Sequence, residues 1–160
     1  MWWLYVLIFG GIIIIGVVLA KKQKSAVDKL ISEGRMIRRN FEFQEYTEIF
    51  TLNQITGESI LEAIKGQDWS GTGVSLKKNN NELPTFFFVK QDSWDGALKP
   101  LESEEGKTKY AFSFNSWKTS NGVAQEPTSM NITLTNVEKA FLKLDPATVV
   151  ATERNKIHTK

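Results

Sequence analysis

The clearest pattern in the chain is a continuous apolar run near its beginning. Residues 2–20 contain no charged and no strongly polar side chain. A helix of this length measures about 28 Å at 1.5 Å per residue, close to the roughly 30 Å hydrocarbon thickness of a bilayer. Aromatic side chains cluster at one end of the run, and such rings favour the headgroup layer. The pattern predicts a transmembrane helix over residues 1–20, with these membrane-spanning positions: Trp2, Trp3, Tyr5, Gly10, Gly11, Gly16 and Ala20.

Two other interpretations of this run stay open. A cleaved signal peptide needs a positively charged start and usually has an apolar segment of about 7 to 15 residues. Here the start offers only the amine of Met1, although Val18 and Ala20 fit a small-residue cleavage site. A buried helix of a soluble domain would normally be shorter and less uniformly apolar. Gly16 and Ala20 also form a small-xxx-small pair, which leaves a homo-oligomer open but without further support.

A basic segment follows the apolar run. Residues 21–40 hold seven Lys or Arg against two Asp or Glu, a net charge of +5. Under the positive-inside rule this flank places the C-terminal part in the cytoplasm. Helical propensity continues to a capping glycine at Gly34, which predicts a juxtamembrane helix or stalk over residues 21–34. The residues expected to face anionic lipid are Lys21, Lys22 and Lys24.

The remaining chain alternates between strand-like and helical periods. Alternation of period two and β-branched or aromatic content predict strands, whereas apolar spacings of three and four predict helices. The expected strands cover residues 36–52, with a bulge near Gln44, and residues 73–78, 84–91, 93–103, 108–119 and 147–152. The expected helices cover residues 56–66 and 127–145. We therefore predict an α+β domain over residues 35–155, with an antiparallel sheet of about five to six strands packed by two amphipathic helices, and a polar tail at residues 156–160.

Three details of the sheet can also be predicted. Phe86, Phe87 and Phe88 follow one another, which indicates a strand with little exposure on either face. Pro100 lacks an N–H group and favours an edge position for its strand. Gly96 indicates a turn or a bulge in the same strand.

Composition changes the picture of what the chain does. Mean hydropathy is −0.25 and the net charge is +2, as in an ordinary soluble protein. Residues 41–160, however, hold 13 Lys or Arg against 16 Asp or Glu, a net charge of −3. The basic character is therefore confined to the membrane flank, which argues for anionic lipid and against nucleic acid as a partner.

Candidate chemistry is sparse. The chain has no cysteine, and its one histidine, His158, lies in the polar tail. Disulfides, thiolate metal sites and cysteine nucleophiles are excluded. Gly71 and Gly73 lack the third glycine of a dinucleotide loop and precede a strand, as a turn does. We predict no catalytic residue, no metal site and no cofactor.

Two tryptophans are the best candidates for a partner surface. Trp94 and Trp117 flank the same expected hairpin and should lie close across it. Tryptophan anchors protein interfaces as well as cores, so core packing is the alternative role.

Together these observations predict a single-pass membrane-anchored binding or assembly module. Its domain would lie at the inner membrane surface, and its partners would be membrane lipid and another, unidentified protein. One alternative is an extracytoplasmic domain, anchored or released by cleavage, in envelope or secretion-complex assembly. A second alternative is an enzyme that uses only carboxylate or hydroxyl groups.

Overall fold

The computed structural model describes residues 21–39, 42–102 and 104–155. Contacts divide the chain into two units, Met1–Met36 and Ile37–Lys160. The predicted membrane-spanning residues lie outside the described residues: Trp2, Trp3, Tyr5, Gly10, Gly11, Gly16 and Ala20. Within the described ranges, no helix has the length and apolar character needed to cross a bilayer.

The first unit contains a helix at residues 21–32. Gly34 ends it in the left-handed conformation with φ of 68°, as expected of a glycine cap. The N–H of Arg35 donates to the carbonyl oxygen of Leu30 at 2.9 Å and closes the last turn. Three side chains predicted to face lipid are exposed on this helix: Lys21, Lys22 and Lys24.

The second unit is an α+β domain, as predicted. Its elements are η1 (Phe43–Glu45), β1 (Tyr46–Asn53), α2 (Gly57–Lys65), β2 (Ser75–Lys78), β3 (Phe86–Lys90), β4 (Trp94–Leu101), β5 (Lys107–Trp117), β6 (Thr119–Ser120), β7 (Val123–Ala124), α3 (Pro127–Leu144) and β8 (Val149–Arg154). Six strands form one sheet in the order β2-β3-β4-β5-β1-β8, and every neighbouring pair is antiparallel. The short hairpin of β6 and β7 was not predicted.

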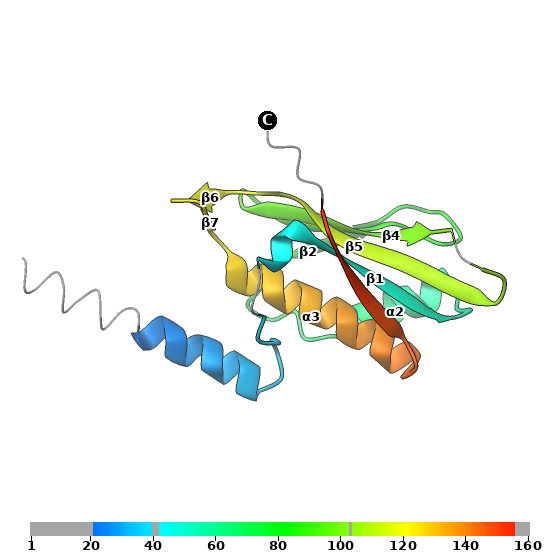
Figure 1. The fold of residues 1–160 in the computed structure, drawn as a ribbon, viewed down its shortest axis with the longest axis horizontal. Helices are drawn as coiled ribbons and strands as arrows, with labels where there is room; N and C mark the ends of the chain where they lie inside the picture. The colour runs from blue at the N-terminus through cyan, green and yellow to red at the C-terminus, as the bar shows by residue number, and fades with distance from the viewer. Residues whose placement is uncertain (1–20, 40–41, 103, 156–160) are drawn as a thin grey trace, which may run out of the picture. The chain divides into compact units, whose positions relative to one another are not determined.

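Helices α2 and α3 lie on the same side of this sheet (Figure 1). Thr56 begins α2, because its Oγ1 accepts a hydrogen bond from the Ser59 N–H at 3.2 Å, and Gly66 ends it. Pro127 occupies the first turn of α3, where its missing N–H costs nothing. Both helices therefore begin and end close to where the sequence predicts.

The core is an aromatic layer between the sheet and the helices. Alternate residues of β1, β3 and β5 point toward α2 and α3 and are buried. The rings of Phe50 and Phe141 are stacked, with centroids 4.6 Å apart and an interplanar angle of 13°. Further rings pack edge-on or tilted around this pair: Phe86, Phe88, Tyr110, Phe112 and Phe114.

The first part of the expected strand over residues 36–52 is wrong, because β1 begins only at Tyr46. Residues 37–39 have no regular structure, and η1 starts at Phe43. The backbone of Ile37 is held by side chains of α3: its N–H donates to Thr135 Oγ1 at 3.2 Å, and its carbonyl accepts from Asn131 Nδ2 at 3.0 Å. Side-chain partners thus replace the strand ladder, which period-two alternation alone cannot reveal.

Two expectations about the central strands are also wrong. The strand with Pro100 is not at an edge, because β4 lies between β3 and β5. Pairing with β3 stops at Leu98, so the strand has no β3 partner beside Pro100 and the missing N–H is tolerated there. Phe87 is 40% exposed on the sheet face opposite the helices. The bulge at Gly96 is confirmed, since the β4–β5 register shifts between Asp95 and Gly96.

The stacked pair predicts which phenylalanine the fold depends on. Phe50→Ala removes a fully buried ring beneath α3, and we expect the free energy of unfolding to fall by about 3–5 kcal/mol. Phe87→Ala, on the open face, is the matched control and should cost less than about 1 kcal/mol. Urea unfolding of the full chain in mild detergent measures the free energy of unfolding of both variants. Equal decreases in the two variants would contradict a core that depends on Phe50.

Candidate functional site

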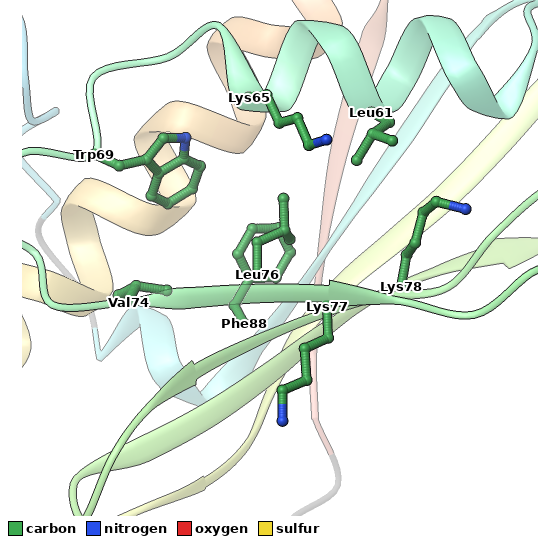
Figure 2. A pocket seen from close by; sticks show the side chains of 8 residues that line it. All are labelled: Leu61, Lys65, Trp69, Val74, Leu76, Lys77, Lys78 and Phe88. Atoms are coloured by element: carbon green, nitrogen blue, oxygen red, sulfur yellow. The ribbon is translucent and has the colours of Figure 1, made fainter.

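A hollow of the domain lies between α2 and the edge strand β2 (Figure 2). Its volume is about 340 Å³, within the range of small ligand pockets. Apolar side chains form most of its lining, and amines stand at its rim. The lining residues are Leu61, Lys65, Trp69, Val74, Leu76, Lys77, Lys78 and Phe88.

Helical spacing decides which side chains of α2 reach the hollow. Ile60 and Ile64 are fully buried in the core. Leu61 and Lys65 lie one position further along the helix, four residues apart, and therefore share the face beside β2. The helix thus contributes an apolar wall and a cation to the same hollow (Figure 2).

Trp69 forms the end wall and is held in place by the helix it follows. Its Nε1 donates to the carbonyl oxygen of Ile64 at 2.8 Å, and its ring centroid lies 5.8 Å from that of Phe88. The loop that carries it is tied to α3, because Asn136 Nδ2 donates to the carbonyl oxygen of Asp68 at 2.8 Å. A large flat apolar surface is therefore preorganised beside β2.

Strand β2 supplies the opposite wall. Leu76 and Lys78 point toward α2, whereas Lys77 points to the other side of the sheet (Figure 2). Within the described residues, Lys65, Lys77 and Lys78 form no ion pair with a carboxylate. The hollow thus combines an apolar floor with cations that have no carboxylate partner in the described part of the chain.

The hollow continues along α2. A second hollow of about 320 Å³ shares Leu61 and Lys78 with the first, and a third of about 350 Å³ shares Gly57 and Glu82 with the second. Gly57 allows α2 to start against the β2–β3 loop, since a Cβ atom there would collide with Pro84. We call these three connected hollows the α2 groove. Its β2 end is basic, and its middle hollow carries Glu58 and Glu82.

The two tryptophans predicted for a partner surface lie together elsewhere. Trp94 and Trp117 are direct partners in the β4–β5 register, as their positions in the sequence indicate. Trp94 is buried, and its Nε1 donates to Ser129 Oγ at 2.9 Å, whereas Trp117 is half-buried. Both line a separate hollow of about 410 Å³ with Asp92 and Lys118 among its other residues. Their role as a partner surface stays a prediction.

A second notable feature is a buried polar cluster that the sequence did not reveal. Its members are Arg39, Glu48, Asn131, Thr135 and Glu138, which we call the Arg39 cluster. The Arg39 side chain is 5% exposed, and its Nη2 lies 2.6 Å from Glu138 Oε1 and 3.7 Å from Glu48 Oε1. Its Nη1 donates to Thr135 at 3.1 Å and to the Asn131 side chain. One guanidinium thus joins residues 37–39, which we call the entry segment, to β1 and α3.

The electrostatics of this cluster favour a protonated carboxyl group. Burial is the main cause that raises the pKa of Glu48 to about 8. Repulsion by Glu138 and a hydrogen bond with it raise this pKa further, whereas the positive charge of Arg39 lowers it. The Oε2 atoms of Glu48 and Glu138 are buried without a hydrogen-bond partner. Paired carboxylates with separated pKa values are a pattern of acid–base catalysis. Here, however, Glu48 and Glu138 line none of the four hollows described above.

Other candidate chemistry is accounted for by the fold. Asn131 begins a glycosylation tripeptide, but its side chain is buried and bonded to Ile37. Gly71 and Gly73 have φ of 71° and 64°, so they serve the turn before β2. In the described part of the chain, no three His, Cys, Asp or Glu side chains gather in a way that would hold a metal ion.

The pKa of Glu48 predicts how stability depends on pH. Glu48 keeps its proton to a higher pH in the folded than in the unfolded chain. The contribution of Glu48 to stability is therefore greatest below about pH 4.5 and falls as pH rises toward about 8, by at most about 1.4 kcal/mol per pH unit. Glu48→Gln, which mimics the protonated form, should remove most of this slope. Urea unfolding of the full chain in detergent at pH 5 and pH 8 measures it, and an unchanged slope in the variant would contradict the assignment.

No protein-family model matches this sequence, and no curated protein is significantly similar to it. An α+β fold with an antiparallel sheet is compatible with many unrelated activities, so the fold class alone does not assign a function. What the domain does must therefore follow from the chemistry of the α2 groove and the Arg39 cluster.

Proposed function

We propose that the chain is a single-pass membrane-anchored binding module, whose domain lies at the inner membrane surface and docks another protein in the α2 groove. The observation that carries the proposal is the groove itself: a preorganised apolar floor bordered by the amines of Lys65 and Lys78, with the Lys77 amine on the other face of β2. None of these lysines has a carboxylate partner among the described residues. Such a combination gives both apolar burial and charge selectivity to a docking partner.

The membrane part of the proposal is supported by the sequence. The apolar run at residues 2–20 has the length of a membrane span, and the following segment carries a net charge of +5. The exposed lysines of the helix at residues 21–32 are available to anionic headgroups. These observations favour an inner-surface domain over the extracytoplasmic alternative.

Binding is also favoured over catalysis by the position of the carboxylates. Glu48 and Glu138 are covered by Arg39, and neither borders the groove. At the β2 end of the groove the polar lining side chains are lysines, beside apolar groups. A hydrolytic reaction at this end would lack a carboxylate base, whereas docking needs only the shape and charge that are present.

The sidedness of the domain is tested with a tag at the C-terminus of the full chain. We expect the tag to resist protease in intact cells and to be digested after lysis, because a cytoplasmic domain is shielded by the membrane. Digestion of the tag in intact cells would contradict the inner-surface placement and favour the extracytoplasmic alternative.

The groove is tested by photo-crosslinking in living cells. A benzophenone amino acid at position 65, on the groove rim, should give a discrete adduct with a neighbouring protein. The same amino acid at position 99, which is exposed on the opposite sheet face, is the matched control and should not. Equal adducts at both positions, or none at either, would contradict docking in the groove.

A further inference from the structure

We propose that the partner in the α2 groove is an extended acidic segment that adds to β2 as a seventh, antiparallel strand. This inference rests on the proposed function, whose docking site it specifies by chemistry. It requires three features in one place: a sheet edge with free backbone groups, a slot for an apolar side chain, and cations at defined register positions. Strand addition uses these features together, with backbone bonds for affinity and pockets for selectivity.

The first feature is the free edge of β2. Strand β2 is the outermost strand of the sheet and pairs only with β3 among the described residues. The N–H of Asn79 donates to the carbonyl oxygen of Thr85, so this pair is hydrogen-bonded toward β3. Because antiparallel pairs alternate, Lys77 and Ser75 also bond toward β3, whereas the backbone groups of Leu76 and Lys78 point to the free edge.

The second feature is the match between this edge and the groove. Leu76 and Lys78 also have their side chains on the α2 side of the sheet (Figure 2). A residue added directly opposite Leu76 would therefore bond its backbone and place its side chain beside Leu76, facing the hollow that Trp69 and Phe88 also line. The first hollow of the α2 groove, about 340 Å³ in volume, has room for one large apolar side chain at this position.

The third feature is the order of the charges. Lys78 would face an added residue on the groove side, and Lys77 would face the next residue on the open side. Both cations are exposed. An opposite charge directly across a strand pair stabilises the pairing, and a like charge destabilises it. An added antiparallel strand, followed from its N-terminus, would pair in turn with Lys78, Lys77, Leu76 and Ser75. At these positions we expect an acidic, a second acidic, a large apolar and a polar residue. Beyond the first position the groove carries Glu58 and Glu82, so the acidic stretch should not extend further in that direction.

The probe is a labelled peptide with this pattern, Thr-Thr-Glu-Glu-Phe-Thr-Thr, blocked at both ends. Its binding to the full chain in nanodiscs of neutral lipid is measured by fluorescence anisotropy. We expect saturable binding that weakens at least about tenfold when both glutamates are replaced by lysine, because the cations of β2 would then repel the peptide. A peptide with the same residues in scrambled order should also bind at least about tenfold more weakly.

A charge-swap variant tests the register. The double variant Lys77→Glu, Lys78→Glu should reverse the preference, so that the lysine peptide binds more tightly than the glutamate peptide. Lys99→Glu, which changes an equally exposed lysine on β4, is the matched control and should keep the preference of the wild type. An unchanged preference in the double variant would overturn the proposal.

Methylation of single peptide nitrogens tests strand addition without any change to the protein. The phenylalanine N–H lies opposite Leu76 and should bond to β2, so its methylation should abolish binding. The N–H of the second glutamate lies opposite Lys77 and points away from β2, so its methylation should change affinity less than about threefold. Equal effects at both nitrogens would exclude the proposed antiparallel register.

The remaining outcomes separate this inference from the proposed function. If position 65 crosslinks in cells but the peptide does not bind, the groove remains a docking site and the extended acidic occupant is wrong. If oleate, an anionic amphiphile, binds the groove and the peptide does not, the groove recognises an acyl chain and the inference is overturned.

Discussion

The architecture of this domain depends on the burial of one aromatic sheet face against α3. The stack of Phe50 on Phe141 fixes α3 over β1, and Tyr110 and Phe112 extend the same layer under the helices. Buried aromatic rings contribute several kcal/mol each, more than the single hydrogen bonds around them. With α3 in this position, its side chains bind the backbone of the entry segment. Helix α2 also packs against α3.

The position of α3 gives the domain two polar features, the Arg39 cluster and the α2 groove. The first is enclosed, whereas the second is exposed. The Arg39 cluster is enclosed, and the guanidinium of Arg39 pairs with side chains of both α3 and β1, so it joins the entry segment to these two elements. The lysines of the α2 groove are exposed and lack carboxylate partners among the described residues. Enclosed charge pairs specify an arrangement, whereas exposed cations beside apolar surface remain available to a partner. This contrast is why we place binding in the groove.

Much of the domain was predictable from local patterns, and the failures have identifiable causes. Strands β1 and β5 alternate with a period of two, Thr56 caps α2, and Pro127 lies in the first turn of α3, so the sequence predicts these elements closely. The segment before Phe43 also alternates, yet side chains of α3 nearly a hundred residues away bind its backbone. The groove was missed for a related reason: Leu61, Leu76 and Trp69 are ordinary apolar residues until the sheet order brings them together. The one sequence feature that indicates the groove is the pair of lysines that follows Leu76 in a short strand.

Docking at the outer edge of β2, beside the α2 groove, is what we propose for this domain. Amide hydrogen exchange of the full chain in nanodiscs, with and without the acidic peptide, compares this edge directly with the other free edge at β8. The account predicts that the N–H groups of Leu76 and Lys78 become strongly protected, while the exchange of β8 is unchanged. Protection at β8, or no change at Leu76 and Lys78 under saturating peptide, would contradict it.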